Sequence, residues 1–86
     1  MSTTSPISIE QLHSEYDHKR ERCRAYARAN MIFDLSDADQ YYLKLLIERS
    51  EAELNYREAM GEFIHIPRIE KQLSSYKEML DTGVIL

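Results

Sequence analysis

The chain has 86 residues, of which 43% are hydrophobic and 30% charged, and its formal net charge at pH 7 is −4. Its length suits one small domain, and its composition favours folding over disorder. The single cysteine, Cys23, excludes a disulfide within the chain and is typical of a reducing compartment.

No apolar run approaches the roughly 18 residues that a membrane span requires. The first residues, MSTTSPIS, lack the basic and apolar regions of a secretory signal. We therefore expect a cytoplasmic protein with a flexible leader over residues 1–7 and a single helical domain over residues 8–86.

The first predicted helix covers about residues 8–30. Ser8 is a suitable N-cap, with Gln11 three residues later as its capping-box partner. An apolar stripe follows at helical spacing. Its members are Ile9, Leu12, Tyr16, Cys23 and Ala27. The linker that follows, MIFDLS, is apolar enough to predict packing into the core.

The second predicted helix covers about residues 37–64 and the third about residues 67–82. Ser36 is a suitable cap for the second helix, and Asp37 and Asp39 favour a helix N-terminus through the helix dipole. Pro67 suits the first position of the third helix, and Gly83 suits its end.

These elements predict an all-α helical bundle, with a long antiparallel two-helix hairpin and a shorter third helix. The second helix also carries an apolar seam, Leu43, Ile47 and Leu54, roughly opposite its main stripe. If the other two helices cover the main stripe, the seam needs a further partner. For so small a domain, we expect that partner to be a second copy, in a homodimer.

Each histidine follows a glutamate by three residues, at Glu10/His13, Glu15/His18 and Glu62/His65. Di-iron carboxylate bundles use this pair, so metal binding is one alternative. The helical positions of His13 and His18 differ by about 140° at 100° per residue, which is too far to share one ion. We therefore interpret the pairs as solvated helix-surface contacts and expect neither metal nor cofactor.

A basic ridge on the first helix consists of Arg20, Arg24 and Arg28. It predicts either a site for phosphates or an acidic partner, or a surface that faces the acids of the second helix. The overall acidity of the chain favours the second interpretation. Those acids are Glu48, Glu51, Glu53 and Glu58.

Arg49 falls within the main apolar stripe of the second helix, where a guanidinium needs a counter-charge. We expect a structural pair with Glu15, Asp17 or Glu53, and the alternative is that Arg49 faces a ligand. Tyr41 and Tyr42 are adjacent, so at least one should lie near the surface. Tyrosine is enriched at protein–protein interfaces.

Two short similarities bear on function. Residues 39–49 with IPRIEK resemble the first helix of AroQ-type chorismate mutases, but Met60 stands where that family has a lysine, so no activity is implied. Leu35–Asp37, Ala52–Leu54 and Ile66–Pro67 resemble, in order, segments of the Hha/YmoA family. That family binds another DNA-binding protein, but its spacing is about one turn shorter and it has a tryptophan that is absent here.

The sequence shows no nucleophile elbow, glycine-rich phosphate loop or zinc spacing, so we expect no enzyme. It predicts a helical protein–protein interaction module that regulates, tethers or inhibits a partner protein. The candidate partner-binding residues are Arg20, Arg24, Arg28, Tyr41, Tyr42, Leu43, Ile47 and Leu54. The alternatives are a nucleic-acid-associated modulator that uses the basic ridge, and a metal-binding protein.

Overall fold

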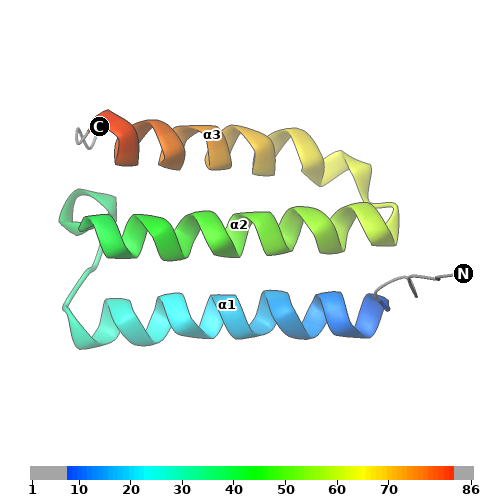
Figure 1. The fold of residues 1–86 in the computed structure, drawn as a ribbon, viewed down its shortest axis with the longest axis horizontal. Coiled ribbons are helices and arrows are strands. Elements are labelled where there is room, and N and C mark those ends of the chain that lie inside the picture. Colours follow the sequence, from blue (N-terminus) through cyan, green and yellow to red (C-terminus); the bar gives the residue numbers. More distant parts are fainter. Residues whose placement is uncertain (1–7, 83–86) are drawn as a thin grey trace, which may run out of the picture.

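The computed structural model describes residues 8–82, which form three α-helices joined by two short connections, each with one 3-10 turn (Figure 1). The elements are α1 (Ile9–Ala29), η1 (Leu35–Asp37), α2 (Gln40–Met60), η2 (Phe63–His65) and α3 (Ile66–Thr82). No β-strand occurs in the described residues. The prediction of an all-α fold with three helices is confirmed.

α1 begins where its cap predicts. Ser8 adopts an extended backbone, and its Oγ accepts a hydrogen bond from the Gln11 N–H at 3.1 Å, which satisfies one of the free donors of the first turn. At the other end, the Asn30 N–H donates to the Tyr26 carbonyl at 3.0 Å, and the Asn30 side-chain amide donates to the same oxygen. Asn30 therefore closes the last turn before the chain leaves the helix.

α2 begins at Gln40, so the predicted start at residue 37 is wrong. Ser36 does not cap α2, because its own N–H donates to Asp34 Oδ1 at 2.8 Å within η1. Asp39 is the N-cap instead, and its Oδ1 accepts from the Tyr42 N–H at 2.8 Å. Two acidic caps in close succession thus make a separate 3-10 turn before the helix.

α2 ends at Met60, so the predicted end at residue 64 is also wrong. Gly61 adopts a left-handed backbone with φ of 74°, which glycine tolerates without steric cost and which ends helices. Pro67 was predicted at the first position of the third helix, but α3 begins one residue earlier, at Ile66, so Pro67 is its second residue. The predicted role of Gly83 lies outside the described residues.

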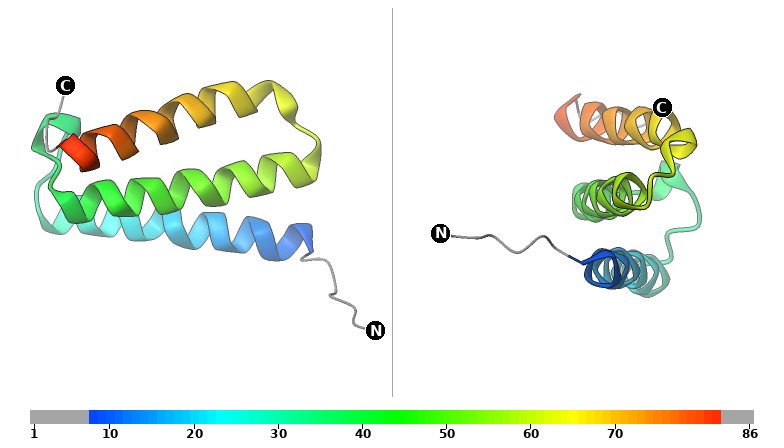
Figure 2. Two further views of the ribbon diagram at one scale, coloured as in Figure 1. Left: turned by 45° about the horizontal axis from the view of Figure 1, so that its top comes forward. Right: turned by 90° about the vertical axis from the view of Figure 1, so that its right-hand side faces the viewer.

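The three helices form a row in which α2 lies between α1 and α3. The end-on view of Figure 2 shows this row, with the α1–α2 connection displaced to one side of it. Among residues 8–82, no Cα atom of α1 lies within 8 Å of a Cα atom of α3. α2 is therefore packed on two opposite sides, and the backbones of α1 and α3 do not approach each other closely.

Side-chain contacts fix how α1 lies on α2. The rings of His13 and Tyr56 are 5.1 Å apart, and Lys19 Nζ lies 3.0 Å from Glu48 Oε1. Farther along α1, the ring of Tyr26 lies 6.2 Å from that of Tyr42. Residue numbers fall along α2 as they rise along α1. The α1–α2 connection and the α2–α3 connection therefore lie at opposite ends of α2.

This arrangement bears on the dimer predicted through the apolar seam. Leu43 is 2% exposed and shares a cluster with Met79 of α3, while Leu54 lines a groove with Leu73 of α3. Ile47, between them in sequence, is partly buried. α3 thus packs on the seam at Leu43 and Leu54, and the homodimer stays a prediction.

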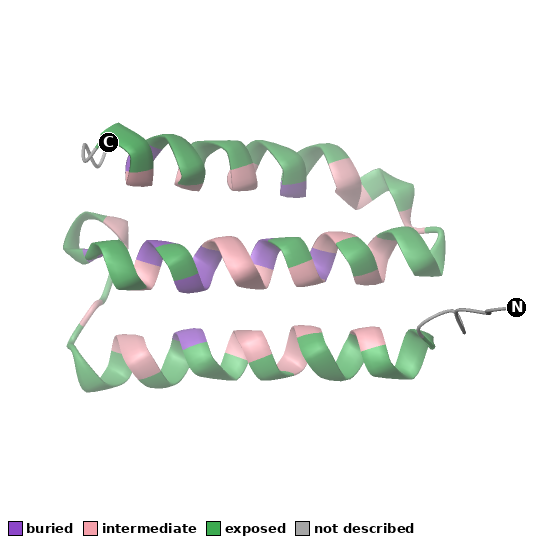
Figure 3. Ribbon diagram, viewed as in Figure 1, coloured by how far each residue is buried: buried purple, intermediate pink, exposed green. Residues whose placement is uncertain are grey.

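Buried residues concentrate on α2, as Figure 3 shows. The main cluster lies toward the η1 end and draws on all three helices. It consists of Cys23, Ala38, Leu43, Leu45, Leu46 and Met79, with Tyr26, Leu35, Tyr42, Tyr76 and Leu80 packed against it. The α1–α2 connection packs on this cluster through Leu35 and Ala38.

Candidate functional site

A groove of about 220 Å³ opens where the α1–α2 connection crosses α2 and α3. We name it the Arg49 groove. It is lined by Ile32, Phe33, Asp34 and Leu35 of the connection, by Tyr42, Leu46 and Arg49 of α2, and by Tyr76 of α3. The lining combines apolar side chains, two phenols, one guanidinium and the carboxylate of Asp34, and it comes from three separate parts of the chain.

The local backbone determines which residues of the connection reach this groove. Met31 adopts a left-handed backbone with φ of 55°, uncommon for a residue with a side chain. The Ile32 N–H then donates to the Ala27 carbonyl at 2.8 Å. Ile32 and Leu35 turn inward and are partly buried, while Phe33 is 83% exposed. The connection therefore packs through Ile32 and Leu35, while Phe33 and Asp34 between them stay exposed.

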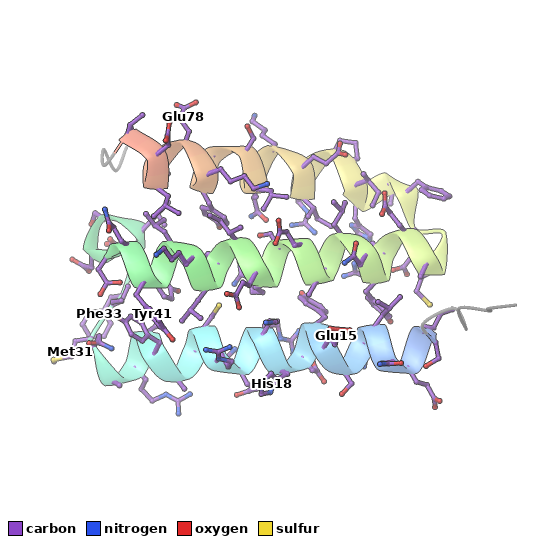
Figure 4. The ribbon with its side chains drawn as sticks, in the orientation of Figure 1. Glu15, His18, Met31, Phe33, Tyr41 and Glu78 are labelled. Atoms are coloured by element: carbon purple, nitrogen blue, oxygen red, sulfur yellow. The ribbon has the colours of Figure 1, made fainter. Side chains whose placement is uncertain are left out.

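The exposure of Met31 and Phe33 corrects the prediction that the whole linker packs into the core. Met31 is 70% exposed, and Figure 4 shows its side chain pointing away from the helices. Phe33 and Tyr41 lie at the same end of the molecule (Figure 4). No local sequence signal separates the exposed Phe33 from the partly buried Ile32, because both side chains are large and apolar.

Arg49 lies partly buried in the groove without a counter-charge. Within the described residues it forms no hydrogen bond and no ion pair. The partners predicted for it are engaged or placed elsewhere. Asp17 lies 3.6 Å from Arg20, and Glu53 lies 3.5 Å from Arg57 and 3.2 Å from Arg68. The predicted structural pair of Arg49 is therefore wrong.

Glu15, the third predicted partner of Arg49, lines a different groove, between α1 and α2. This groove and a further one between α2 and α3 each contain charges of both signs. The first is lined by Leu12, Glu15, Lys19, Glu48, Glu51, Ala52 and Asn55, and the second by Leu54, Glu70, Leu73, Ser74 and Lys77. Lys19 is paired with Glu48 at 3.0 Å and Lys77 with Glu51 at 3.7 Å. The Arg49 groove differs in holding a cation without an ion-pair partner.

The pKa values of three groups near the groove reflect burial, the charge of Arg49 and hydrogen bonding. Burial raises the pKa of the Cys23 thiol, and the Arg49 charge offsets only part of that increase. Burial also raises the pKa of Tyr42 above its ordinary value, and its protonated hydroxyl can donate a hydrogen bond. Hydrogen bonds from the Ser36 hydroxyl and N–H lower the pKa of Asp34, which stays charged at the rim.

The predicted basic ridge does not face the acids of α2. Arg20 lies 3.6 Å from Asp17 of its own helix and its guanidinium lies over the Tyr16 ring at 5.4 Å. Arg24 lies 3.4 Å from Glu21, and Arg28 is exposed. The α1 cations that do reach α2 are Lys19 and Arg22, at 3.0 Å and 3.9 Å from Glu48.

The two adjacent tyrosines point in different directions, as predicted. Tyr41 is 48% exposed, and its hydroxyl accepts a hydrogen bond from Arg22 at 3.3 Å. Tyr42 is partly buried and lines the Arg49 groove. Tyr26 contacts both rings, and its hydroxyl donates to Asp39 Oδ2 at 2.6 Å. Only Tyr42 is therefore part of the candidate site.

Among the described residues, no group of three or more histidine, cysteine or acidic side chains is arranged to hold a metal ion. The Glu-x-x-His pairs have other contacts. His13 contacts the ring of Tyr56, and Glu62 accepts a hydrogen bond from Arg57 at 2.6 Å.

Comparison of the chain with protein-family models, curated proteins and solved structures finds no match. The short similarities in the sequence are therefore not extended to membership of a family. In residues 8–82, no helix combines the length and apolar character that crossing a membrane requires. The functional interpretation is built on the residues of this chain alone.

Proposed function

We propose that this protein is a helical protein–protein interaction module that regulates, tethers or inhibits a partner without catalysis of its own. The partner binds at the Arg49 groove, at the end where an antiparallel α1–α2 hairpin presents its connecting segment. The observation that carries the proposal is Arg49, a partly buried guanidinium with no ion-pair or hydrogen-bond partner in the described residues.

A partly buried charge loses hydration, and a lone one is costly unless something pairs with it. The chain supplies pairs for its neighbouring cations, since Arg57 lies 2.6 Å from Glu62 and Lys19 lies 3.0 Å from Glu48. A bound partner that brings a counter-charge to Arg49 recovers this cost. Binding is thus favoured over the free state by an interaction that the free protein does not make.

The connection beside Arg49 adds exposed apolar surface. Phe33 and Met31 are 83% and 70% exposed, so a partner at the groove can bury two large apolar side chains. The left-handed backbone of Met31 holds this segment in an uncommon conformation, a feature that concentrates at functional sites. Phe33 is positioned to act as an aromatic anchor.

The experiment is affinity capture of the tagged protein from the cells that produce it, followed by mass spectrometry. Wild type is compared with Arg49→Met and Phe33→Ala. The matched control is Glu78→Gln, because Glu78 is exposed on α3 and points away from α2 (Figure 4). We expect a protein that is retained by wild type and Glu78→Gln and lost by both groove variants.

Circular dichroism of each variant checks that the helices are intact before capture is interpreted. A partner retained equally by all four proteins would place binding outside the Arg49 groove. No partner with wild type, under conditions where the tagged protein is abundant and folded, would contradict the interaction function itself.

A further inference from the structure

We infer that the Arg49 groove binds the carboxylate of an acidic side chain in a partner segment whose neighbouring residues are apolar. The inference deepens the proposed function and rests on it, because it names the chemistry of the partner. It is carried by the juxtaposition of one unpaired guanidinium, two phenols and an apolar wall within about 220 Å³.

The guanidinium selects the charge. Arginine presents a planar fork of donors that matches both oxygens of a carboxylate. Ile32, Leu35 and Leu46 form the apolar part of the lining, against which the residues beside the carboxylate can pack. The hydroxyls of Tyr42 and Tyr76 are further donors in the lining.

The groove favours a singly charged carboxylate over a phosphate group. Phosphate recognition uses clusters of arginines, whereas this groove contains one arginine. Its rim also holds Asp34, whose pKa is lowered by Ser36 and whose negative charge repels a dianion. A carboxylate carries one negative charge, so Arg49 alone can neutralise it.

The size of the groove selects a side chain instead of a cofactor. Sites for small molecules have volumes of about 300–1,000 Å³, and this groove has about 220 Å³. An aspartate or glutamate side chain fits such a space. The residues beside it in the partner then lie against Phe33, which is 83% exposed at the edge.

The probe is the blocked peptide acetyl-Leu-Glu-Leu-amide, whose only charge is its side-chain carboxylate. Its binding is followed by NMR, through the Arg49 Nε–H and the backbone amides of Tyr42 and Tyr76. The glutamine peptide of the same sequence is the neutral control, and sodium acetate tests the carboxylate alone. We expect saturable shifts with the glutamate peptide and binding at least about tenfold weaker for the glutamine peptide, as for loss of a charge-assisted hydrogen bond.

Two arginine variants make the test specific. Arg49→Met should abolish the difference between the two peptides. Arg24→Met should leave it unchanged, because Arg24 is exposed and paired with Glu21 on α1. Equal binding of both peptides, no shift with any probe, or equal loss in both variants would each overturn the inference. Acetate that binds as tightly as the glutamate peptide would overturn the assignment to a partner segment.

The outcome separates this inference from the proposed function. If capture is lost with Phe33→Ala and retained with Arg49→Met, the protein is an interaction module and the carboxylate inference fails. If the glutamate peptide binds through Arg49 and no protein is captured, the carboxylate site stands and the interaction function fails.

Discussion

Along the helix axes, the two ends of the three-helix bundle, the η1 end and the η2 end, differ in the chemistry of their buried side chains. At the η1 end, α2 is packed through apolar side chains, and Leu43, Leu45 and Leu46 are 2%, 4% and 4% exposed. Toward the η2 end, Ile69 of α3 is 0% exposed, and a carboxylate is buried as well. Glu53 is 7% exposed and lies 3.2 Å from Arg68 of α3 and 3.5 Å from Arg57 of α2.

The difference shows how one helix is buried in two ways. Apolar contacts have no direction, so the η1 end is stabilised in proportion to the area and volume that its side chains fill. A buried carboxylate requires partners in place, so the η2 end is stabilised only while Glu53 and its arginines remain together. Arg57 also pairs with Glu62 at 2.6 Å, which extends the network to the chain beyond Gly61.

The largest expected effect is at the η1 end. Leu46→Ala removes a side chain that is 4% exposed, and we expect a loss of about 2–5 kcal/mol in the free energy of unfolding. Leu54→Ala is the matched control, because Leu54 is only partly buried beside a groove, and should cost less. Urea denaturation followed by circular dichroism measures both. Equal losses would show that the apolar packing is not concentrated at this end.

The η2 end predicts a smaller loss that depends on charge. Glu53→Gln keeps the shape and leaves Arg57 and Arg68 without their shared carboxylate, so we expect a loss of about 1–3 kcal/mol. Glu48→Gln removes a carboxylate whose side chain is 44% exposed, so its effect should lie within about 0.5 kcal/mol. The same denaturation experiment compares them. A neutral Glu53→Gln would mean that the two ends do not differ in this way.

A third prediction concerns pH. Hydrogen bonds from the Tyr26 hydroxyl and the Tyr42 N–H lower the pKa of Asp39 in the folded protein. Its contribution to stability is therefore present above the ordinary carboxyl pKa and is lost as pH falls through the lowered pKa. Asp39→Asn can still cap α2 and should show a smaller drop in melting temperature than wild type between pH 7 and pH 2.5. An identical drop in both proteins would contradict the prediction.

The smallest expected effect is at Arg49. Because Arg49 has no counter-charge in the described residues, Arg49→Met should leave the free energy of unfolding unchanged or raise it by up to about 1 kcal/mol. Arg57→Met is the comparison on the same helix, since Arg57 pairs with Glu53 and Glu62. It should destabilise the protein. An Arg49→Met variant that unfolds as readily as Arg57→Met would show that Arg49 is structural.

Local sequence signals predicted much of the fold and little of the site. Ser8 capped α1 where expected, and Pro67 marked the start of α3. For α2, Ser36 and Asp39 are both good caps three residues apart, and sequence alone does not choose between them. Asp39 prevails because Ser36 is held by Asp34 within η1. Of the candidate partner-binding residues, only Tyr42 belongs to the Arg49 groove.

The sequence by itself determined that the chain forms three helices, because caps, glycine, proline and the spacing of apolar residues act over a few neighbours. Only the tertiary structure decided which sides of α2 are covered. α2 has apolar residues on two opposite sides, and periodicity reports their presence without saying which partner each side meets. Packing α1 and α3 on opposite sides buries both, which draws Leu43 into the core. The same packing leaves Arg49 without an ion-pair partner in the described residues. Of its predicted partners, Asp17 pairs with Arg20, Glu53 pairs with Arg57 and Arg68, and Glu15 lines another groove.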